Sequence, residues 1–436
     1  MLKILASLKQ GSFKKGSAAF AICALMLAGA CTTTAVEDEG PVIAAPVEQE
    51  VEDTNTDIAL PAVKNRVALL LPTTGPNARV GRSLANAANM ALLDLGGGDI
   101  ELEVYDTAAN GPERAAQRAV DDGALVFLGP LMAENVRAIR AFARSRDIPV
   151  ISYSNDAEVA GNGVYVMGFQ PAQSIERVVN FARSRGIDRF AALIPSGTYG
   201  RRASDAFMAS VNGAGGRVTA METYERKKSA LPASVRRLTD FEARTARAAQ
   251  GGIVRADGTV APVEERIAPV SFETLLIADG GAIASEFLQS LQRYGAGPGK
   301  VRYLGTELWN ADGRIASARG LRGSWYASVP DARFNQFAGR YRAKFGGAPS
   351  RLSSLAYDSV LLVQGQAANW QLNAPFPMKS LSDPDGFVGL DGIFRFGANG
   401  VAQRGLEVQE VGPGGTKIIS PAPRAFQNNR VSMLVN

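Results

Sequence analysis

From residue 66 onward, short apolar runs alternate with longer segments whose apolar positions recur at helical intervals. Residues 67–71 are continuously apolar, which is typical of a strand covered on both faces, and residues 81–95 follow with the spacing of an amphipathic helix. This order of strand and helix then repeats. Because parallel strands need crossover connections, it predicts an α/β fold with helices on both faces of a parallel sheet. Further strands are predicted at 100–105, 125–128 and 149–152, and further helices at 114–122 and 135–146.

A second series of the same kind begins after residue 169. The residues from 64 onward are too many for one compact core, so the two series predict two doubly wound, Rossmann-like lobes. After residue 387 the chain becomes rich in strands and turns, where 391–396 and 406–411 both alternate with a period of two and are joined through residues 397–400. The predicted helices of the second series lie at 171–185, 200–213, 230–249 and 282–294, and its strands at 190–194, 218–223, 275–278 and 301–304.

Residues 251–271 interrupt the second series. The dipeptides Gly251-Gly252 and Asp257-Gly258, followed by Pro262, predict a surface loop or a small hairpin insertion. An arginine-rich stretch at 236–247 precedes it. Two interpretations of this stretch stay open, namely a solvated helix face and a docking patch for an acidic partner.

Residues 1–30 have the features of a targeting segment and are set apart from the fold. Four lysines accompany an apolar run at 17–30 that is too short to span a bilayer comfortably. The run ends in Leu-Ala-Gly-Ala before Cys31, which resembles the lipobox of bacterial lipoproteins and implies a lipid on Cys31 that anchors the chain to a membrane. The alternative is an ordinary secretory signal with an incidental Cys31. Thr32, in place of an aspartate, resembles the default for the periplasmic side of the outer membrane, with the inner membrane left open.

Residues 32–63 hold eight acidic residues and no lysine or arginine. They are rich in threonine, proline and valine and show no helical or strand period, so we predict a disordered acidic tether. The formal net charge of +5 for the whole chain includes the four lysines of the targeting segment. No basic cluster of the kind that binds nucleic acid remains, and no nucleic-acid partner is expected.

The chain has no histidine, which excludes Ser-His-Asp and Cys-His catalysis and histidine-ligated zinc. Its two cysteines are Cys23, inside the targeting segment, and Cys31, directly after it. The rest of the chain therefore has no thiol nucleophile and no disulfide. No phosphate-binding loop is present either. The sequence predicts a protein that is not an enzyme and that needs no metal or cofactor.

Several short segments spread along residues 64–436 resemble, in their order and spacing, the leucine/isoleucine/valine-binding branch of the type I periplasmic-binding family. The resemblance implies a bilobal fold with a three-segment hinge, in which lobe I is 64–169 plus 331–378 and lobe II is 170–328 plus 379–436. The segments are Ala68-Leu69-Leu70-Leu71-Pro72, Thr74-Gly75-Pro76, Tyr105-Asp106, Leu128-Gly129-Pro130-Leu131, Pro149-Val150-Ile151-Ser152, Thr198-Tyr199-Gly200, Tyr303-Leu304-Gly305-Thr306-Glu307 and Leu390-Asp391-Gly392.

Two of these segments are also similar to those of lipoprotein penicillin-binding-protein activators. The first is Leu128 to Leu131, which is followed by Glu134-Asn135-Val136, and the second is Gly305 to Trp309. This resemblance implies a protein that stands on the outer membrane and contacts a bifunctional peptidoglycan synthase through the periplasm.

The family resemblance also implies a ligand cleft between the lobes, in which hydroxyls and backbone N–H groups hold a ligand carboxylate and an acid holds its amine. Glu307 matches the amine-binding acid. Ala133 falls where the family has a serine, and Asp156 lies near the family's threonine and would repel a carboxylate. The carboxylate half of the site is therefore expected to be degraded. The candidate cleft residues are Thr73, Thr74, Leu131, Met132, Ser152, Tyr153, Ser154, Asn155, Tyr199, Glu307 and Trp309.

Several of these candidates have an alternative structural role. The two threonines would serve equally well to cap a helix or close a turn. Tyr153 and Trp309 would serve as core side chains, Tyr199 would close a turn, and Glu307 would form a salt bridge at the hinge.

Two functions from different classes remain. The first is a lipid-anchored activator of a peptidoglycan synthase that works by protein–protein contact. The alternative is a solute-binding receptor for amino acids or related small ligands, feeding an ABC importer. The lipobox, the tether and the degraded carboxylate half favour the first function, whereas the fold and Glu307 favour the second.

Overall fold

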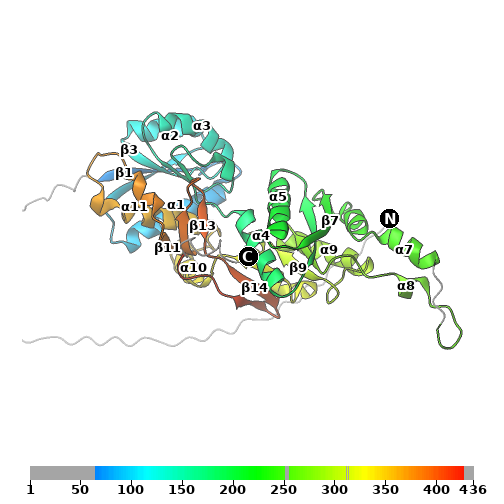
Figure 1. Cartoon of the computed structure of the whole chain (residues 1–436). Coiled ribbons are helices and arrows are strands. Elements are labelled where there is room, and N and C mark those ends of the chain that lie inside the picture. Colours follow the sequence, from blue (N-terminus) through cyan, green and yellow to red (C-terminus); the bar gives the residue numbers. More distant parts are fainter. Residues whose placement is uncertain (1–63, 251–254, 311, 313, 427–436) are drawn as a thin grey trace, which may run out of the picture. The chain divides into compact units, whose positions relative to one another are not determined.

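The computed structural model describes residues 64–426 apart from 251–254, 311 and 313 (Figure 1). The lipobox with Cys31 and the predicted tether lie outside the described residues. In the described part of the chain, no helix is both long enough and apolar enough to cross a membrane.

The first lobe is built on a five-stranded parallel sheet with the strand order β2-β1-β3-β4-β5 (Figure 1). The apolar runs of the sequence predict the first four strands, whereas β5 is too short to stand out from the loops around it. The strands are β1 (Asn65–Leu71), β2 (Ile100–Asp106), β3 (Ala124–Leu128), β4 (Val150–Ser152) and β5 (Val164–Val166).

Helices cover both faces of this sheet. The sequence of β1 is continuously apolar because both of its faces are buried. Val67 and Leu69 pack against α1, α10 and α11, and Ala68 and Leu70 pack against α2 and α3 on the opposite face. The helices are α1 (Ala78–Asp94), α2 (Pro112–Asp121), α3 (Ala133–Arg144), α10 (Ala332–Phe345) and α11 (Ser353–Gln364).

The second lobe repeats this design. Its parallel strands lie in the order β7-β6-β8-β9-β10, the same order as in the first sheet, and two antiparallel strands, β14 and β15, extend the sheet beyond β10. Helices α4 and α5 cover one face, and α6 and α9 cover the other. The predicted α/β class with two doubly wound lobes is therefore confirmed. The elements are α4 (Pro171–Ser184), β6 (Arg189–Pro195), α5 (Thr198–Gly213), β7 (Arg217–Tyr224), α6 (Leu231–Leu238), β8 (Thr274–Ile277), α9 (Gly281–Arg293), β9 (Arg302–Gly305), β10 (Trp325–Ser328), β14 (Glu407–Gly412) and β15 (Gly415–Ser420).

The chain passes between the lobes three times, at 167–170, 329–331 and 405–406. Short 3₁₀ helices lie in the connecting loops. They are η1 (Ala157–Val159), η2 (Glu307–Trp309), η3 (Ile315–Ser317), η4 (Arg319–Leu321), η5 (Ala367–Asn369) and η6 (Met378–Ser382).

The single helix predicted at 230–249 is two helices, α6 and α7 (Phe241–Gln250). The break falls at Asp240, whose φ of 48° lies in the left-handed region and cannot continue a helix. Three of the four arginines of this stretch are paired with acids, as Arg237 with Glu222 at 3.0 Å, which favours the solvated-face interpretation over a free docking patch. The fourth, Arg244, is buried and donates to backbone carbonyls. The described part of the 251–271 insertion contains the short helix α8 (Val263–Arg266).

The lobe predicted for the C-terminal strands is wrong up to residue 404, and the connection predicted through residues 397–400 leads to an additional strand at 402–404. Strands β11 (Phe387–Gly389), β12 (Gly392–Phe396) and β13 (Ala402–Arg404) form a separate antiparallel sheet, so β12 does not pair with β14. Phe394 and Phe396 pack into the same core as α1 and α11. Residues 379–404 therefore belong with the first lobe and not with the second, because their apolar face is buried there.

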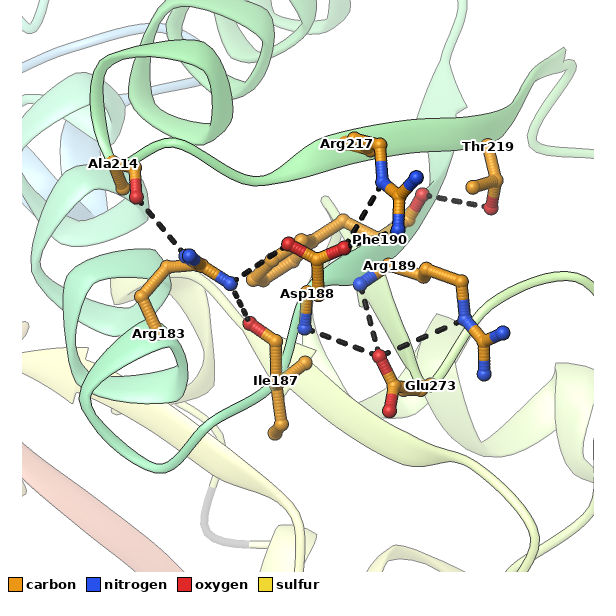
Figure 2. Close-up of polar contacts among 9 residues, drawn as sticks. All are labelled: Arg183, Ile187, Asp188, Arg189, Phe190, Ala214, Arg217, Thr219 and Glu273. Carbon is orange, nitrogen blue, oxygen red and sulfur yellow. Dashed lines mark hydrogen bonds and ion pairs between the residues drawn. The ribbon is translucent and has the colours of Figure 1, made fainter.

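A network of charged groups ties the base of the second lobe together (Figure 2). Arg183 and Arg217 pair with Asp188 at 3.0 and 2.6 Å. Glu273 accepts hydrogen bonds from the backbone N–H groups of Asp188 and Arg189 at 3.1 and 3.0 Å. The network joins the N-terminal ends of β6, β7 and β8, so the opposite, carboxyl ends of these strands are left to form a site.

Candidate functional site

A cleft of about 1100 Å³ opens at the carboxyl ends of the parallel strands and is lined by residues of both lobes. The first lobe contributes the N-terminal half of α1, the loops after β3 and β4, and the segment between α10 and α11. The second lobe contributes the N-terminal turns of α4 and α5 and the segment after β9. Ligands in open α/β sheets bind outside the carboxyl ends of the strands, so this cleft is the candidate ligand site.

The structure brings most of the predicted site residues together in the cleft. Tyr153 reaches it with its ring, but its hydroxyl is turned into the core and lies 2.7 Å from the hydroxyl of Ser359. The predicted residues that line the cleft are Leu131, Met132, Tyr153, Ser154, Asn155, Tyr199 and Glu307.

The structure places the other four predicted residues outside the cleft. The backbone N–H of Thr73 and the hydroxyl of Thr74 both donate to Asp106, at 3.1 and 2.6 Å, and so close the turn after β1. Ser152 is fully buried and donates to the carbonyl of Pro130 at 2.9 Å. Trp309 is buried in the second lobe and donates to the carbonyl of Asp279 at 2.8 Å. The two threonines therefore stabilise a turn, and Ser152 and Trp309 belong to the buried core.

Glu307 begins η2 and is held by two neutral hydroxyls. Tyr199 on α5 donates to Oε1 at 3.1 Å, and Ser174 on α4 donates to Oε2 at 2.9 Å. Burial raises the pKa of the Glu307 carboxyl to about 7. Among the described residues no arginine or lysine pairs with it, so the alternative of a hinge salt bridge is not supported. Ser174 is not among the residues predicted from the sequence, because no motif in α4 indicates that this helix lines the cleft.

Replacing Glu307 by glutamine is expected to stabilise the full chain by about 1–2 kcal/mol at pH 8 and by much less at pH 5. The folded pKa of about 7 lies above the ordinary value of 4.5, so the stability that the protonated group contributes is complete below pH 4.5 and is lost as the pH rises through 7. Thermal unfolding at the two pH values measures the difference.

Glu273→Gln is the control for this prediction. Hydrogen bonds, first of all from the backbone of Arg189, lower the pKa of Glu273, so its contribution is present at high pH and is lost as the pH falls. The glutamine variant at this position should therefore be less stable than the parent at pH 8. A loss of stability at pH 8 in both variants would contradict the assignment of Glu307.

Asp156 occupies the carboxylate half of the cleft. Its side chain is 5% exposed, and the carboxylate pairs with Arg137 on α3 at 2.5 Å and with Arg202 on α5 at 2.6 Å. Burial alone would raise the pKa of Asp156, but hydrogen bonds from Arg202, the backbone of Glu158 and Arg137 outweigh it and hold that pKa below its usual range. The expected repulsion of a ligand carboxylate is thus offset by two arginines that the sequence did not single out. Arg202 follows Tyr199 by three residues, so their shared helix face was the available signal.

The serine hydroxyls of the loop after β4 form hydrogen bonds within the loop itself. Ser152 Oγ accepts from the backbone N–H of Ser154 at 3.0 Å, and Ser154 Oγ accepts from that of Asp156 at 3.0 Å. Leu131, Met132 and Ala133, on the loop after β3, offer no hydroxyl. The charged groups that α3, α5 and the loop after β4 bring to the cleft are Glu134, Arg137, Asp156 and Arg202.

A bilobal α/β protein with a cleft at the carboxyl strand ends has the architecture of a binding protein. The sequence model of the family described as "Periplasmic binding protein" matches residues 64–416, and the chain belongs to that family. Its fold is that of a binding protein and not that of an enzyme.

Three relatives show what the chain is similar to. An uncharacterised protein of Rickettsia prowazekii is 27% identical over 175 residues, which are 40% of this chain and 47% of that protein. The penicillin-binding protein activator LpoA of Photobacterium profundum is 26% identical over 167 residues, 38% of this chain and 27% of LpoA. The crystal structure of the leucine binding protein LivK of Thermotoga maritima superposes with a TM-score of 0.56 at 17% identity, covering 82% of this chain and 98% of LivK. The matched region thus spans less than half the length of these two curated relatives.

Proposed function

We propose that the chain is a lipid-anchored protein on the periplasmic side of the outer membrane that activates a bifunctional peptidoglycan synthase by protein–protein contact. The observation that carries the proposal is the filled carboxylate half of the cleft, where the carboxylate of Asp156 already pairs with both arginines, Arg137 and Arg202. The similarity to LpoA, a penicillin-binding protein activator, supports it. The lipid on Cys31 and the tether 32–63 are part of the proposal, since they would hold the folded lobes away from the membrane.

Free-energy estimates for the cleft favour this function over amino-acid capture. A charge-assisted hydrogen bond contributes about 1.5–3 kcal/mol, and a ligand carboxylate must first break those of Asp156. A loss of this size lowers affinity by about tenfold or more for each bond. The two lobes are therefore better suited to binding another protein than to binding ordinary amino acids in the cleft.

A solute receptor that feeds an ABC importer is the second candidate. Glu307 favours it, because a buried carboxylate held by two hydroxyls can accept a ligand amine. The structural similarity to LivK, a leucine binding protein, is consistent with this candidate but shows the fold alone.

Two measurements on the full chain in detergent test the proposal. The first is a thermal-shift scan against the amino acids, in which a true ligand at about a hundred times its Kd would add about 2.7 kcal/mol to the stability. The second is binding to a bifunctional peptidoglycan synthase, together with the rate of that synthase with and without the chain. We expect no shift with any amino acid, measurable binding and an increased rate.

Glu307→Ala separates the two candidates. Activation should survive this substitution, because the proposed contact does not use the amine half of the cleft. An amino-acid shift that disappears in Glu307→Ala, combined with no binding to the synthase, would establish the receptor and overturn the activator.

A further inference from the structure

We propose that Asp156 is an internal ligand of the cleft. Its carboxylate occupies an arginine pair, Arg137 and Arg202, that would otherwise bind a carboxylate from solution, and it thereby holds the two lobes together with no ligand bound. The inference concerns the arginine pair and the lobes, and it stands whether or not a synthase is the partner.

The contacts of Asp156 place it between the lobes. Arg137 lies on α3 of the first lobe, the lobe that also carries Asp156, and Arg202 lies on α5 of the second lobe. The contact of Asp156 Oδ1 with Arg202 Nη2 at 2.6 Å is therefore a bridge across the cleft, whereas the contact with Arg137 stays within the first lobe.

The carboxylate of Asp156 is fixed before it meets Arg202. Its Oδ1 accepts from the backbone N–H of Glu158 at 3.0 Å and caps η1, and its own N–H donates to Ser154 Oγ at 3.0 Å. A carboxylate that the fold holds in place pays no association entropy when it binds. It therefore outcompetes a free carboxylate of the same intrinsic affinity at ordinary concentrations.

The charges explain why the site suits an anion. Two guanidinium groups face one buried carboxylate, and the second nearby acid, Glu158, is mostly exposed and lies 3.7 Å from each of them. If the carboxylate of Asp156 is removed, both arginines remain at the cleft, and Glu158 is the acid that stays within 4 Å of them in the described part of the chain. The vacated position then has the size and the donors for a small carboxylate such as acetate.

Pulsed electron paramagnetic resonance on the full chain in detergent measures the bridge. Cys23→Ala and Cys31→Ser remove both native thiols, and spin labels are placed at Ala141→Cys on α3 and Ala209→Cys on α5, two exposed alanines on opposite lobes. Without ligand, we expect one narrow distance distribution in the parent and a broader, longer one in Asp156→Asn and in Arg202→Gln. Arg201→Gln is the matched control, because the guanidinium of the adjacent Arg201 hydrogen-bonds, among the described residues, to Thr198 of its own helix at 3.1 Å and forms no bridge across the cleft.

Acetate tests the arginine pair itself. Asp156→Ala should give the longer distance in chloride and return to the short one in acetate at the same ionic strength, and adding Arg137→Gln to this variant should weaken the return. The inference is overturned if Asp156→Asn and Arg202→Gln keep the parent distribution, or if acetate and chloride act alike on Asp156→Ala. The binding assay above decides separately whether the chain activates a synthase.

Discussion

Asp391→Asn is expected to lower the free energy of unfolding by about 3 kcal/mol or more, because it breaks a buried ion pair and leaves one partner charged. Asp391 is fully buried and lies 2.8 Å from Arg351 Nη1. The side chain of Arg351 is only 12% exposed, and its other acidic neighbour, Asp331, is farther away at 3.5 Å. An asparagine has the same shape as the aspartate, so the loss reports the charge and not the packing.

The surroundings of this pair have little capacity to compensate. Arg404, on β13, is 9% exposed and donates from Nη2 to the carbonyl of Met167 at 2.7 Å. Its Nε and Nη1 have no hydrogen-bond partner within the described ranges. The guanidinium instead lies over the rings of Phe169 and Phe394, at 5.1 and 5.3 Å from their centroids. Arg351 also lies over the ring of Phe169 and pairs with Asp331. The cluster therefore links two of the segments that pass between the lobes, 167–170 and 329–331.

Asp358→Asn is the control, and the opposite result is expected for it. Burial, and after it the charge of Asp391, raise the pKa of Asp358 to about 7 from an ordinary value of 3.8. The stability that its protonated form contributes is therefore lost as the pH rises through 7. Asparagine keeps the acceptor for the backbone N–H of Leu390, which lies 2.7 Å from Oδ1. Asp358→Asn should thus be about neutral at pH 6 and stabilising at pH 8.

Urea unfolding of the full chain at pH 6 and pH 8 compares the two variants. Equal losses for Asp391→Asn and Asp358→Asn at both pH values would show that the cluster acts through packing and not through charge. A lower free energy of unfolding for Asp391→Asn, together with a higher one for Asp358→Asn above pH 7, would support the assignment. It would show that Asp391 forms the ion pair and that burial disfavours the charged form of Asp358.

The fold could be predicted from the sequence wherever burial on both faces of a sheet forces a continuous apolar run. Strand β1 is such a case, since its alternate side chains fill two cores. Strands β12 and β14 show the limit of this approach. Both alternate with a period of two, but the period states only that one face is buried and not which sheet supplies the neighbours. The partner sheets are set by Phe394 and Val408, which enter the cores of different lobes.

The site could be predicted only in part for a related reason. The resemblance to a family position predicts Glu307. In the structure its buried carboxylate has no basic partner among the described residues, as the binding of a ligand amine requires. Arg137 and Arg202 meet at Asp156 although they lie far apart in the sequence and on different lobes. No spacing rule within one helix or strand reports such a contact, and an arginine on a helix is usually a solvated residue. Asp156 itself was correctly placed near the cleft, but its effect depended on those two partners.

Gly200→Ala is expected to destabilise the full chain by about 2–3 kcal/mol through forced displacement of backbone. Gly200 lies in the first turn of α5, and a Cβ there would fall 1.6 Å from the carbonyl oxygen of Pro195 at the end of β6. No rotamer relieves this clash, because both atoms belong to the main chain or are fixed to it. Gly81 occupies the corresponding place in the first lobe, where a Cβ would fall 2.0 Å from the carbonyl oxygen of Pro72. Each lobe thus uses a glycine to bring the helix that follows its first strand close to that strand.

Gly339→Ala is the matched control, because Gly339 lies inside α10 with no atom within 4 Å of its would-be Cβ and should gain about 0.5–1 kcal/mol from the higher helix propensity of alanine. Thermal unfolding of the parent and of the two variants measures these differences. Gly200→Ala has a second expected effect, since α5 also carries Tyr199 and Arg202. Moving the first turn of α5 should lengthen the spin-label distance across the cleft, whereas Gly339→Ala should leave it unchanged. If Gly200→Ala and Gly339→Ala proved equally stable, the close approach of α5 to β6 would be wrong, and with it the placement of Arg202 against Asp156.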